Sequence, residues 1–237
     1  MFHLSQRSKS VFKMEFVRGI PTCDLADAMT RLNLGTRFVH DARLVSPAPF
    51  SPRLAEAYFV GHAHTVRFAP ASSPEPASAI NAIDSLSTGQ VLVVAGVPGN
   101  PNAYFGGLLC ARAVAVGAVA AVVDGRVRDL KEIWENEHRF AVASTSAAQS
   151  VLGAGTYAKC VAVGQPITLC RNTDYPIRIN EGDIVVGDVD GVVVVPVARA
   201  EEIASLAKTI QANDARAKVD IVENDISLVD AFKKHRS

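Results

Sequence analysis

The sequence predicts a mixed α/β fold built around a strand–helix–strand unit, and three observations support this. The apolar run GQVLVVAG (89–96) lies between glycines, as buried strands often do. A second apolar run, AVAAVVDG (118–125), follows a helical stretch that ends at Gly117. The remainder up to residue 196 is rich in short β-branched runs. Together these patterns indicate a parallel βαβ unit followed by a β-rich half.

The elements before this unit follow from local patterns. A short helix begins near Thr22, with Thr22 or Asp24 as its cap, and stops at Gly35. Residues 36–56 are rich in Pro and Ser and are expected to form irregular or edge structure. The run AYFVGHAHTVRF (57–68) predicts a strand with a break at Gly61. ASAINAIDSL (77–86) predicts a short helix.

The second half of the chain predicts more strands and two closing helices. RDLKEIWE (128–135) is a short helix, and GDIVVGDVDGVVVVP (182–196) is two strands around a turn at Asp188 to Gly191. The other predicted strands are RFAVAST (139–145), AKCVAVG (158–164) and PITLC (166–170). The spacing of apolar residues predicts a helix over 198–218 and a last one over about 227–234.

Composition limits the classes of protein to consider. The chain has 237 residues, 49% of them hydrophobic, and no formal net charge. We expect a single domain (1–237), with a core over about 20–200 and a helical extension over about 198–237. Zero net charge argues against a nucleic-acid partner, and no apolar run is long enough to span a membrane. The four cysteines show no CxxC spacing and are expected to be reduced, which favours a cytoplasmic protein.

The first 14 residues carry three basic side chains and no acidic one. This pattern weakly resembles a transit peptide, but a ragged or helical terminus of a soluble protein is favoured.

The most informative residues lie in the loops after the two central strands. If the crossover is right-handed, both loops meet at the sheet edge where ligands of α/β proteins bind. In the first loop, the amides around Gly106, Gly107, Leu108 and Leu109 open a helix and suit a carboxylate or phosphate. In the second, DGRVRD (124–129), Arg128 offers a planar fork for a carboxylate. Asp129 offers a hard oxygen for Mg²⁺ or Mn²⁺.

Structural explanations exist for the same residues. An Arg and an Asp after a strand commonly form a solvated turn or a helix cap. Gly106 and Gly107 could serve close packing of helix on sheet. When only the spacing of these residues is considered, the structural roles are favoured over a ligand site.

A resemblance to a known family changes this balance. FGGLLCARAVAVGAVAAVVDGRVRD (105–129) resembles the signature of the RraA-like family, which includes class II 4-hydroxy-4-methyl-2-oxoglutarate (HMG) aldolases. DLADAM, FVGHAHTV, AIDSLSTGQVLVV and GDIVVGDVDGVVVVP also fit, so the resemblance covers roughly Thr22 to Ala200. It implies a layered β/β/α sandwich of the swivelling RraA-like type. It also implies homotrimers or homohexamers with active sites between subunits.

The resemblance implies a role for each matching residue. Asp129 would be the direct protein ligand of a divalent metal, and Arg128 would hold the substrate and polarise a catalytic water. The amides of Gly107, Leu108 and Leu109 would bind a pyruvate-type carboxylate. The family commonly has an acidic residue where this chain has Gly107, which puts the water network and the native substrate in question. Asp214 is the candidate for an acid contributed by a neighbouring subunit, with Glu223 as the second choice.

The implied function is a metal-dependent lyase that cleaves a carbon–carbon bond of a small α-keto acid. Retro-aldol cleavage of HMG and decarboxylation of oxaloacetate both pass through a pyruvate enolate, so one site can perform both. The alternatives are a lyase for a specialised keto acid and a non-catalytic regulatory module that binds a protein. A methyltransferase is disfavoured because VLVVAGVPGN (91–100) lacks the GxGxxG spacing.

Other residues are assigned mainly structural roles. His62 and His64 share one face of a predicted strand and could form a metal pair, but no third ligand is evident. Asp188 is expected to form its turn and cap backbone groups, and Asp84 to cap or pair. Trp134 either walls the pocket or packs in the core.

Overall fold

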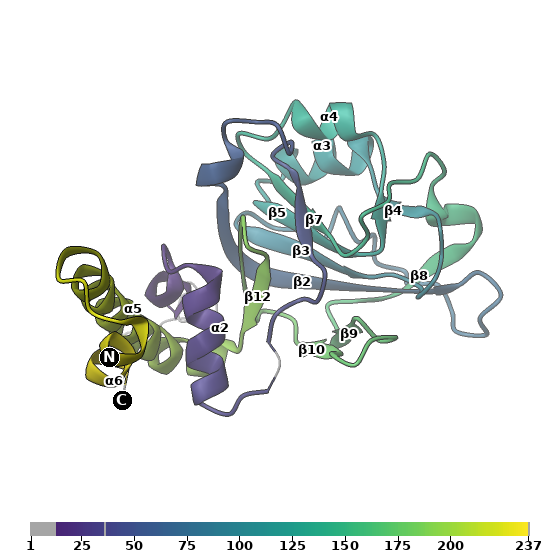
Figure 1. Cartoon of the computed structure of the whole chain (residues 1–237). Helices are drawn as coiled ribbons and strands as arrows, with labels where there is room; N and C mark the ends of the chain where they lie inside the picture. The colour runs from purple at the N-terminus through teal and green to yellow at the C-terminus, as the bar shows by residue number, and fades with distance from the viewer. Residues whose placement is uncertain (1–12, 36, 237) are drawn as a thin grey trace, which may run out of the picture.

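The computed structural model describes residues 13–35 and 37–236. An eight-stranded sheet forms the centre of the molecule, with helices α3 and α4 above it and a small β9–β10 ribbon below it in Figure 1. Helices α2, α5 and α6 lie together at one side of the sheet. The predicted layered α/β class is confirmed.

The strands and helices have the following bounds. The sheet and its neighbouring strands are β1 (Arg43–Ser46), β2 (Tyr58–Pro70), β3 (Gln90–Ala95), β4 (Ala103–Phe105), β5 (Ala120–Asp124), β6 (Arg126–Val127), β7 (Ala141–Ser144), β8 (Ala158–Val163), β9 (Ile167–Leu169), β10 (Ile177–Ile179), β11 (Ile184–Asp188) and β12 (Val192–Val195). The helices are α2 (Thr22–Arg31), α3 (Gly107–Ala115), α4 (Leu130–Trp134), α5 (Ala200–Glu223) and α6 (Leu228–His235).

The centre of the sheet is parallel and its edges are antiparallel. The strand order is β1-β7-β5-β3-β2-β11-β12, with β8 paired to β2 beside β11. Strands β2, β3, β5 and β7 run parallel. Because Ala95 of β3 pairs with Asp124 of β5, the two loops that follow these strands leave the sheet side by side. The predicted βαβ unit is therefore present.

Alternating side chains of the central strands form two apolar layers. Leu92, Val94 and Val123 face α3 and α4, and they pack in one cluster with Phe105 and Ile133. Val91, Val93 and Val122 face the β9–β10 ribbon on the other side. A third cluster joins α2 and α5 to β11 and β12. Because both faces are covered, the strands have the continuous apolar runs seen in the sequence.

The predicted break of the strand at Gly61 is wrong. Strand β2 runs without interruption through this residue. A Cβ atom added at Gly61 would lie 2.5 Å from the carbonyl oxygen of Gly89 and 2.9 Å from Val91. Glycine is needed here for a close approach of neighbouring chains rather than for a turn.

The predicted helix over 77–86 is also wrong, because side chains there satisfy the backbone in turns. The Asn81 side-chain oxygen accepts hydrogen bonds from the amides of Ile83 and Asp84 at 3.0 and 3.1 Å. Ser78 accepts one from Ile80 at 3.1 Å. Such local bonds compete with helix formation.

Three short strands were not predicted. Strands β4 and β6 pair in parallel beside the main sheet, and β10 pairs with β9. These strands have two or three residues, too few for their periodicity to be read from the sequence. The segment 36–56, expected to be irregular or edge structure, contains β1, which pairs with β7 at the edge of the sheet.

The helical side of the molecule is fixed to the sheet through Asp188. Its carboxylate accepts hydrogen bonds from the Thr22 amide at 2.8 Å and the Thr22 hydroxyl at 2.7 Å, and from the Asp190 amide at 3.0 Å. The turn-forming and capping role predicted for Asp188 is confirmed. Thr22 does not cap α2 through its own side chain, which corrects that expectation.

The sequence also raised the question of a transit peptide at residues 1–14 and of a membrane-spanning segment. The segment 1–14 lies outside the described residues except for its last two. Within the described part of the chain, none of the helices has the length and apolar character needed to cross a membrane.

Asp220 ties the last helix to α5, and we expect this contact to depend on pH. Its carboxylate accepts hydrogen bonds from Lys234 at 2.8 Å, His235 at 2.6 Å and Asn224 at 3.0 Å. The Lys234 ammonium, followed by His235 and Asn224, holds the pKa of Asp220 well below its usual range. The contribution to stability is therefore complete above the usual carboxyl pKa and is lost as pH falls below it towards the folded-state value.

Asp220→Asn should accordingly detach α6 at neutral pH. Limited proteolysis at pH 7 is expected to cut near residues 224–227 faster in the variant than in wild type, with the difference shrinking in acid. Equal cleavage rates at pH 7 would contradict this role. Lys233→Gln, on an exposed side chain of the same helix, is the control.

Candidate functional site

The residues predicted to carry chemistry gather where β6 meets α4. Strand β5 ends at Asp124, Gly125 turns the chain, and β6 leads to Arg128 and Asp129. A Cβ atom at Gly125, whose φ is 145°, would lie 2.8 Å from the Tyr104 ring. Glycine therefore allows the turn that brings Arg128 and Asp129 beside the start of α3.

Asp129 contacts the first turn of α3 directly. The Gly107 amide donates a hydrogen bond to Asp129 Oδ2 at 3.1 Å, and Arg128 Nε lies 3.3 Å from the same oxygen. The side chains of Arg128 and Asp129 are 41% and 37% exposed, so both remain open to a ligand. The structure thus brings the two predicted loops together at one point.

The backbone of Asp129 is left-handed, with φ of 58°. This conformation costs about 1–2 kcal/mol for most residues, although Asp and Asn tolerate it better than others. It places Asp129 at the N-terminal cap of α4 while its carboxylate points to α3. Asp129 therefore occupies the helix-cap position that a purely structural role would give it. Its side chain, however, makes no hydrogen bond that caps α4.

The start of α3 has the properties expected of an anion site. Gly106 precedes the helix in an extended conformation, and Cys110 makes the first bond back to it. Among the residues that the structure describes, no acceptor is found for the amides of Leu108 and Leu109. These amides and the positive end of the helix dipole lie one residue beyond the Gly107–Asp129 bond.

Glu132 is a further acidic residue of this site that the sequence analysis did not identify. A Cβ atom built on Gly107 would overlap the Glu132 carboxylate. A Cβ atom on Gly106 would lie 2.7 Å from Asp129 Oδ2 and 3.0 Å from Arg128 Cγ. The absence of side chains at Gly106 and Gly107 therefore makes room for Arg128, Asp129 and Glu132, and not for close packing of α3 on the sheet. The signal was present, because Glu132 follows Asp129 by three residues, in the first turn of the helix that Asp129 precedes.

The loop 149–153 closes the other side of Arg128. A Cβ atom at Gly153 would lie 3.4 Å from Arg128 Nη1. The Leu152 carbonyl accepts a hydrogen bond from the Ala103 amide at 2.9 Å, which holds this loop against β4. Gly153 was not identified from the sequence, because its contact with Arg128 depends on the tertiary fold.

Other candidates have partners that account for them. His64 is buried and contacts Glu181 at 3.1 Å and Ser85 at 2.9 Å, and His62 contacts the Gly182 carbonyl at 3.0 Å. Burial raises the pKa of Glu181, but hydrogen bonds from His64 and Thr65 outweigh this and keep it below the ordinary value. Within residues 13–35 and 37–236, no group of three or more His, Cys, Asp and Glu is arranged to hold a metal alone.

Three further predicted residues have clear structural contacts. Asp84 pairs with Arg112 at 2.8 Å, as expected. Trp134 donates to the Val45 carbonyl at 2.8 Å and packs edge-on against Phe50, so it ties α4 to β1. Asp214 lies on α5 and pairs with Arg236 of the same chain.

We assign the cysteine thiols no chemical role at the site. All four are free thiols. Burial raises the pKa of Cys110 and of Cys170 to about 11, which leaves both thiols protonated and unreactive at neutral pH.

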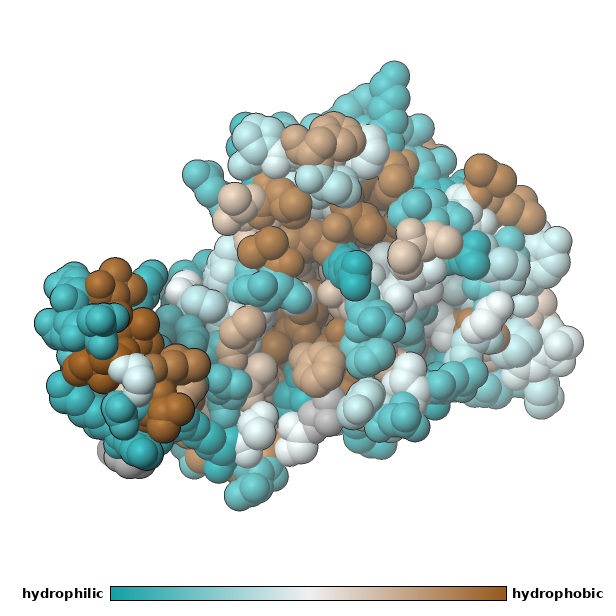
Figure 2. Space-filling model, viewed as in Figure 1, coloured by the Kyte–Doolittle hydropathy of each residue, from teal (hydrophilic) through white to brown (hydrophobic). Residues whose placement is uncertain are grey.

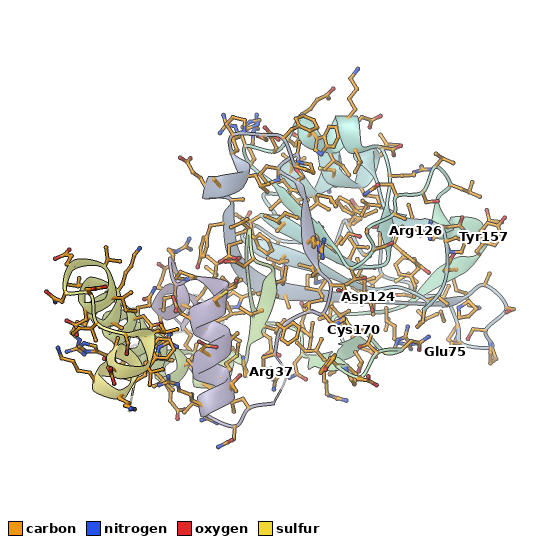
Figure 3. The ribbon with its side chains drawn as sticks, viewed as in Figure 1. Arg37, Glu75, Asp124, Arg126, Tyr157 and Cys170 are labelled. Carbon is orange, nitrogen blue, oxygen red and sulfur yellow. The ribbon has the colours of Figure 1, made fainter. Side chains whose placement is uncertain are left out.

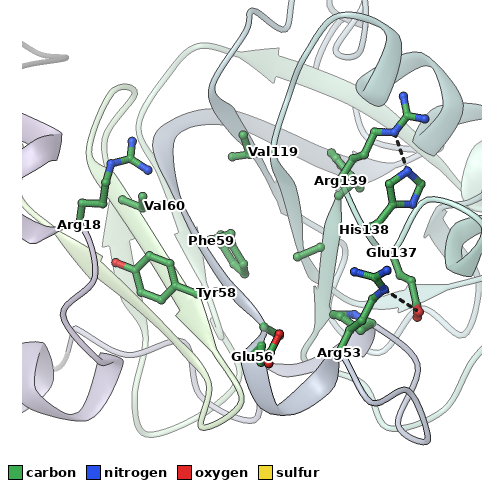
Figure 4. A pocket seen from close by; sticks show the side chains of 14 residues that line it. Arg18, Arg53, Glu56, Tyr58, Phe59, Val60, Val119, Glu137, His138 and Arg139 are labelled. Atoms are coloured by element: carbon green, nitrogen blue, oxygen red, sulfur yellow. Dashed lines mark hydrogen bonds and ion pairs between the residues drawn. The ribbon is translucent and has the colours of Figure 1, made fainter.

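A separate pocket lies at the opposite end of the parallel strands. Figure 4 shows this cavity of about 340 Å³, with Phe140 and Ala141 at the start of β7 among its lining residues. Its charged side chains pair mainly with each other: Arg53 lies 3.9 Å from Glu137, and Arg139 donates to His138 at 2.7 Å. Ligands of such sheets bind at the carboxyl ends of the strands, so the Asp129 site is the stronger candidate.

Comparison with known proteins defines the family. The RraA-like family model, described as Aldolase/RraA, matches residues 22–194, and the chain belongs to this family. It is 29% identical over 212 residues, 89% of each chain, to a Halalkalibacterium halodurans protein named "Putative 4-hydroxy-4-methyl-2-oxoglutarate aldolase".

Two solved structures share the fold. An uncharacterized protein from Pseudomonas syringae pv. tomato aligns with a TM-score of 0.77 at 22% identity and covers 94% of both chains. RraAS2 from Streptomyces coelicolor, described as an unusual member of the RNase ES inhibitor RraA protein family, aligns with a TM-score of 0.70 at 20% identity. That alignment covers 87% of this chain and 96% of the other.

Proposed function

We propose that this protein is a divalent-metal-dependent lyase that cleaves a carbon–carbon bond in a small α-keto acid. The observation that carries the proposal is the convergence of Arg128, Asp129 and the first amides of α3. HMG and oxaloacetate are the proposed substrate types, in keeping with the relative named as an HMG aldolase.

The side chains present fit a magnesium or manganese ion. The carboxylates of Asp129 and Glu132 both lie against the two glycines at the start of α3. Mg²⁺ in proteins is commonly held by one or two carboxylates and several waters, so this pair is a sufficient donor set. A bound divalent cation would supply Lewis-acid stabilisation of the negative charge that develops on the keto oxygen.

The chain's own groups would bind and orient the keto acid. The amides of Leu108 and Leu109 would accept its carboxylate, and the Arg128 fork would hold the adjoining oxygens. Fixing this end aligns the bond between C3 and C4 for cleavage, with pyruvate enolate as the product that must then be protonated. The same arrangement serves retro-aldol cleavage and decarboxylation.

The experiment that tests this function is release of pyruvate from HMG and from oxaloacetate with added Mg²⁺ or Mn²⁺. EDTA should abolish the release. If neither substrate yields pyruvate, calorimetric titration of metal with pyruvate present separates the alternatives. Binding would favour a specialised keto acid, and no binding would favour a regulatory role.

We further propose that Glu132 does the work that an acid at position 107 does in relatives. Glu132→Gln should lower kcat by about 10²-fold, because one preorganised charged group at the reacting centre is typically worth that much. Glu132→Ala should lose as much activity and also empties the space of the Glu132 carboxylate. Gly107→Asp combined with Glu132→Ala should restore much of the loss, since the new carboxylate enters that space. Failure of this double variant to exceed Glu132→Ala would argue against a shared position. Glu135→Gln, directly after the same helix, is the control.

The proposed assembly is a homotrimer or homohexamer in which Asp214 reaches a neighbouring site. Figure 2 shows apolar side chains gathered on the α5–α6 hairpin at the left of the molecule. Three apolar side chains on this hairpin are largely exposed: Val222 at 71%, Leu228 at 56% and Val229 at 61%. An exposed apolar patch of this kind is typical of a surface that another protein chain covers. Light scattering should give a mass of about three or six times the 25.2 kDa of one chain.

A further inference from the structure

A second arginine, Arg126, begins β6, and Arg128 follows directly after this strand. The Arg128 amide continues the pairing with β4 by donating to the Phe105 carbonyl at 3.0 Å. Because the two arginines are two residues apart along this stretch, their side chains leave the chain on the same side. The loop 149–153 passes both: Arg126 Nη1 lies 3.5 Å from the Gln149 carbonyl, and Gly153 is beside Arg128. Between them the Ser150 amide donates to the Val127 carbonyl at 3.1 Å, which keeps the loop in register with β6.

Arg126 has no acidic partner among the residues that the structure describes. The ion pairs found there do not include it, and its one hydrogen bond is at the distance limit. A half-buried guanidinium without a carboxylate is incompletely satisfied, because it carries five donors. Figure 3 shows Arg126 on the side of the molecule that carries Tyr157, away from the C-terminal helices.

Arg126 lines a polar cavity of about 230 Å³ at the carboxyl ends of β3, β5 and β7. A second guanidinium, that of Arg171, extends into the same region and donates to the Gly96 carbonyl at 2.7 Å. Neutral polar side chains complete the lining, namely Asn100, Thr145, Ser146, Asn172 and Thr173. These neutral groups can both donate and accept, whereas the two guanidinium groups only donate.

The one carboxylate in this cavity is already engaged by neutral donors. Asp124 accepts from the Thr145 hydroxyl at 3.0 Å and from the Cys170 amide at 2.8 Å. It therefore does not neutralise Arg126 through a direct ion pair. With two arginines and one aspartate, the formal charge of the lining is 2 − 1 = +1. This surplus favours an anion.

We propose that Arg126, with the cavity it lines, binds the distal carboxylate of a dicarboxylic keto acid whose reacting end is held by Arg128. This inference rests on the proposed function and adds a specificity residue to it: HMG and oxaloacetate both carry a distal carboxylate, and Arg126 would be the group that recognises it. Two residues of extended strand span about 7 Å, so the two side chains leave the backbone at neighbouring positions. Guanidinium forks that reach into adjoining space from such positions suit the two carboxylates of a short diacid. A neutral distal end would leave Arg126 unpaired and would bind more weakly.

The test is calorimetric binding of two unreactive keto acids of equal chain length, with saturating Mn²⁺. 2-Oxoglutarate carries a distal carboxylate, and 2-oxopentanoate carries a methyl group in its place. Wild type should bind 2-oxoglutarate about 10- to 100-fold more tightly, the range for one hydrogen-bonded charged group. Arg126→Gln should remove this preference, and Arg126→Lys should keep part of it. Arg31→Gln, an exposed arginine on α2, should keep all of it.

The outcomes separate this inference from the function on which it rests. Equal affinity of wild type for the two acids, or an unchanged preference in Arg126→Gln, would overturn the role of Arg126 alone. Binding of neither acid to wild type, together with no pyruvate from HMG or oxaloacetate, would overturn the keto-acid site and this inference with it. Circular dichroism of Arg126→Gln and Arg126→Lys shows whether each variant is folded before its affinity is compared.

Discussion

Asp129→Asn is expected to abolish metal-dependent release of pyruvate while leaving the fold intact. The amide cannot supply the negative oxygen that a divalent cation requires, and kcat/KM should fall by about 10³-fold, as when a preorganised charge is removed from an active site. Asparagine is preferred to alanine for this test because it tolerates the left-handed backbone of residue 129. The measurement is pyruvate release at saturating Mg²⁺ or Mn²⁺, with thermal unfolding followed in parallel.

A matched control is available in the same chain. Asp225 is also an aspartate in the left-handed conformation, with φ of 51°, and it is exposed at the turn between α5 and α6. Asp225→Asn should retain full activity. Substantial activity of Asp129→Asn with Mg²⁺ would mean that Asp129 is a structural residue of the α3–α4 contact and not a metal ligand.

Arg128→Lys is expected to be nearly as damaging. An ammonium cannot reproduce the planar fork that contacts two oxygens at once, and lysine also lacks the Nε atom that lies 3.3 Å from Asp129. We expect kcat/KM to fall by about 10²-fold, with the larger part in kcat if the fork acts mainly in the transition state. Steady-state kinetics on HMG and oxaloacetate measure both parameters.

The comparison for this variant is Arg112→Lys. Arg112 pairs with Asp84 on an exposed surface, where a single ion pair contributes little and lysine can replace it. Its kinetics should match wild type. If Arg128→Lys behaved in the same way, Arg128 would be a surface charge beside the site and the substrate fork would have to come from elsewhere.

Much of the fold could be predicted because the pattern of the sequence is local. The runs at 89–96 and 118–125 became β3 and β5, with α3 between them, and the last two helices lie where their spacing of apolar residues indicated. The positions of Arg128 and Asp129 after β5 followed from the same pattern. Predictions failed where local hydrogen bonds or tertiary contacts decide the backbone, as at Asn81 and Gly61.

The candidate site shows the same division. The sequence indicated Gly107, Arg128 and Asp129 as one group, since parallel strands bring their following loops to one edge. It did not identify Glu132 or Gly153. Glu132 belongs to the site because its carboxylate fills the space beside Gly107 on α3, and Gly153 because its loop contacts Arg128. The sequence offered no basis for a role of Arg126, because its lack of an acidic partner among the described residues is a property of the folded chain.

The sequence by itself determined the α/β class, the βαβ core and the family, because each depends on residues close together along the chain. Only the tertiary structure decided how the charges of the site are combined. Residues 107 and 132 are 25 positions apart, and their overlap depends on how α3 packs beside α4. Side-chain packing in three dimensions, which no spacing encodes, placed the Glu132 carboxylate beside Gly107 and left Arg126 facing an open cavity.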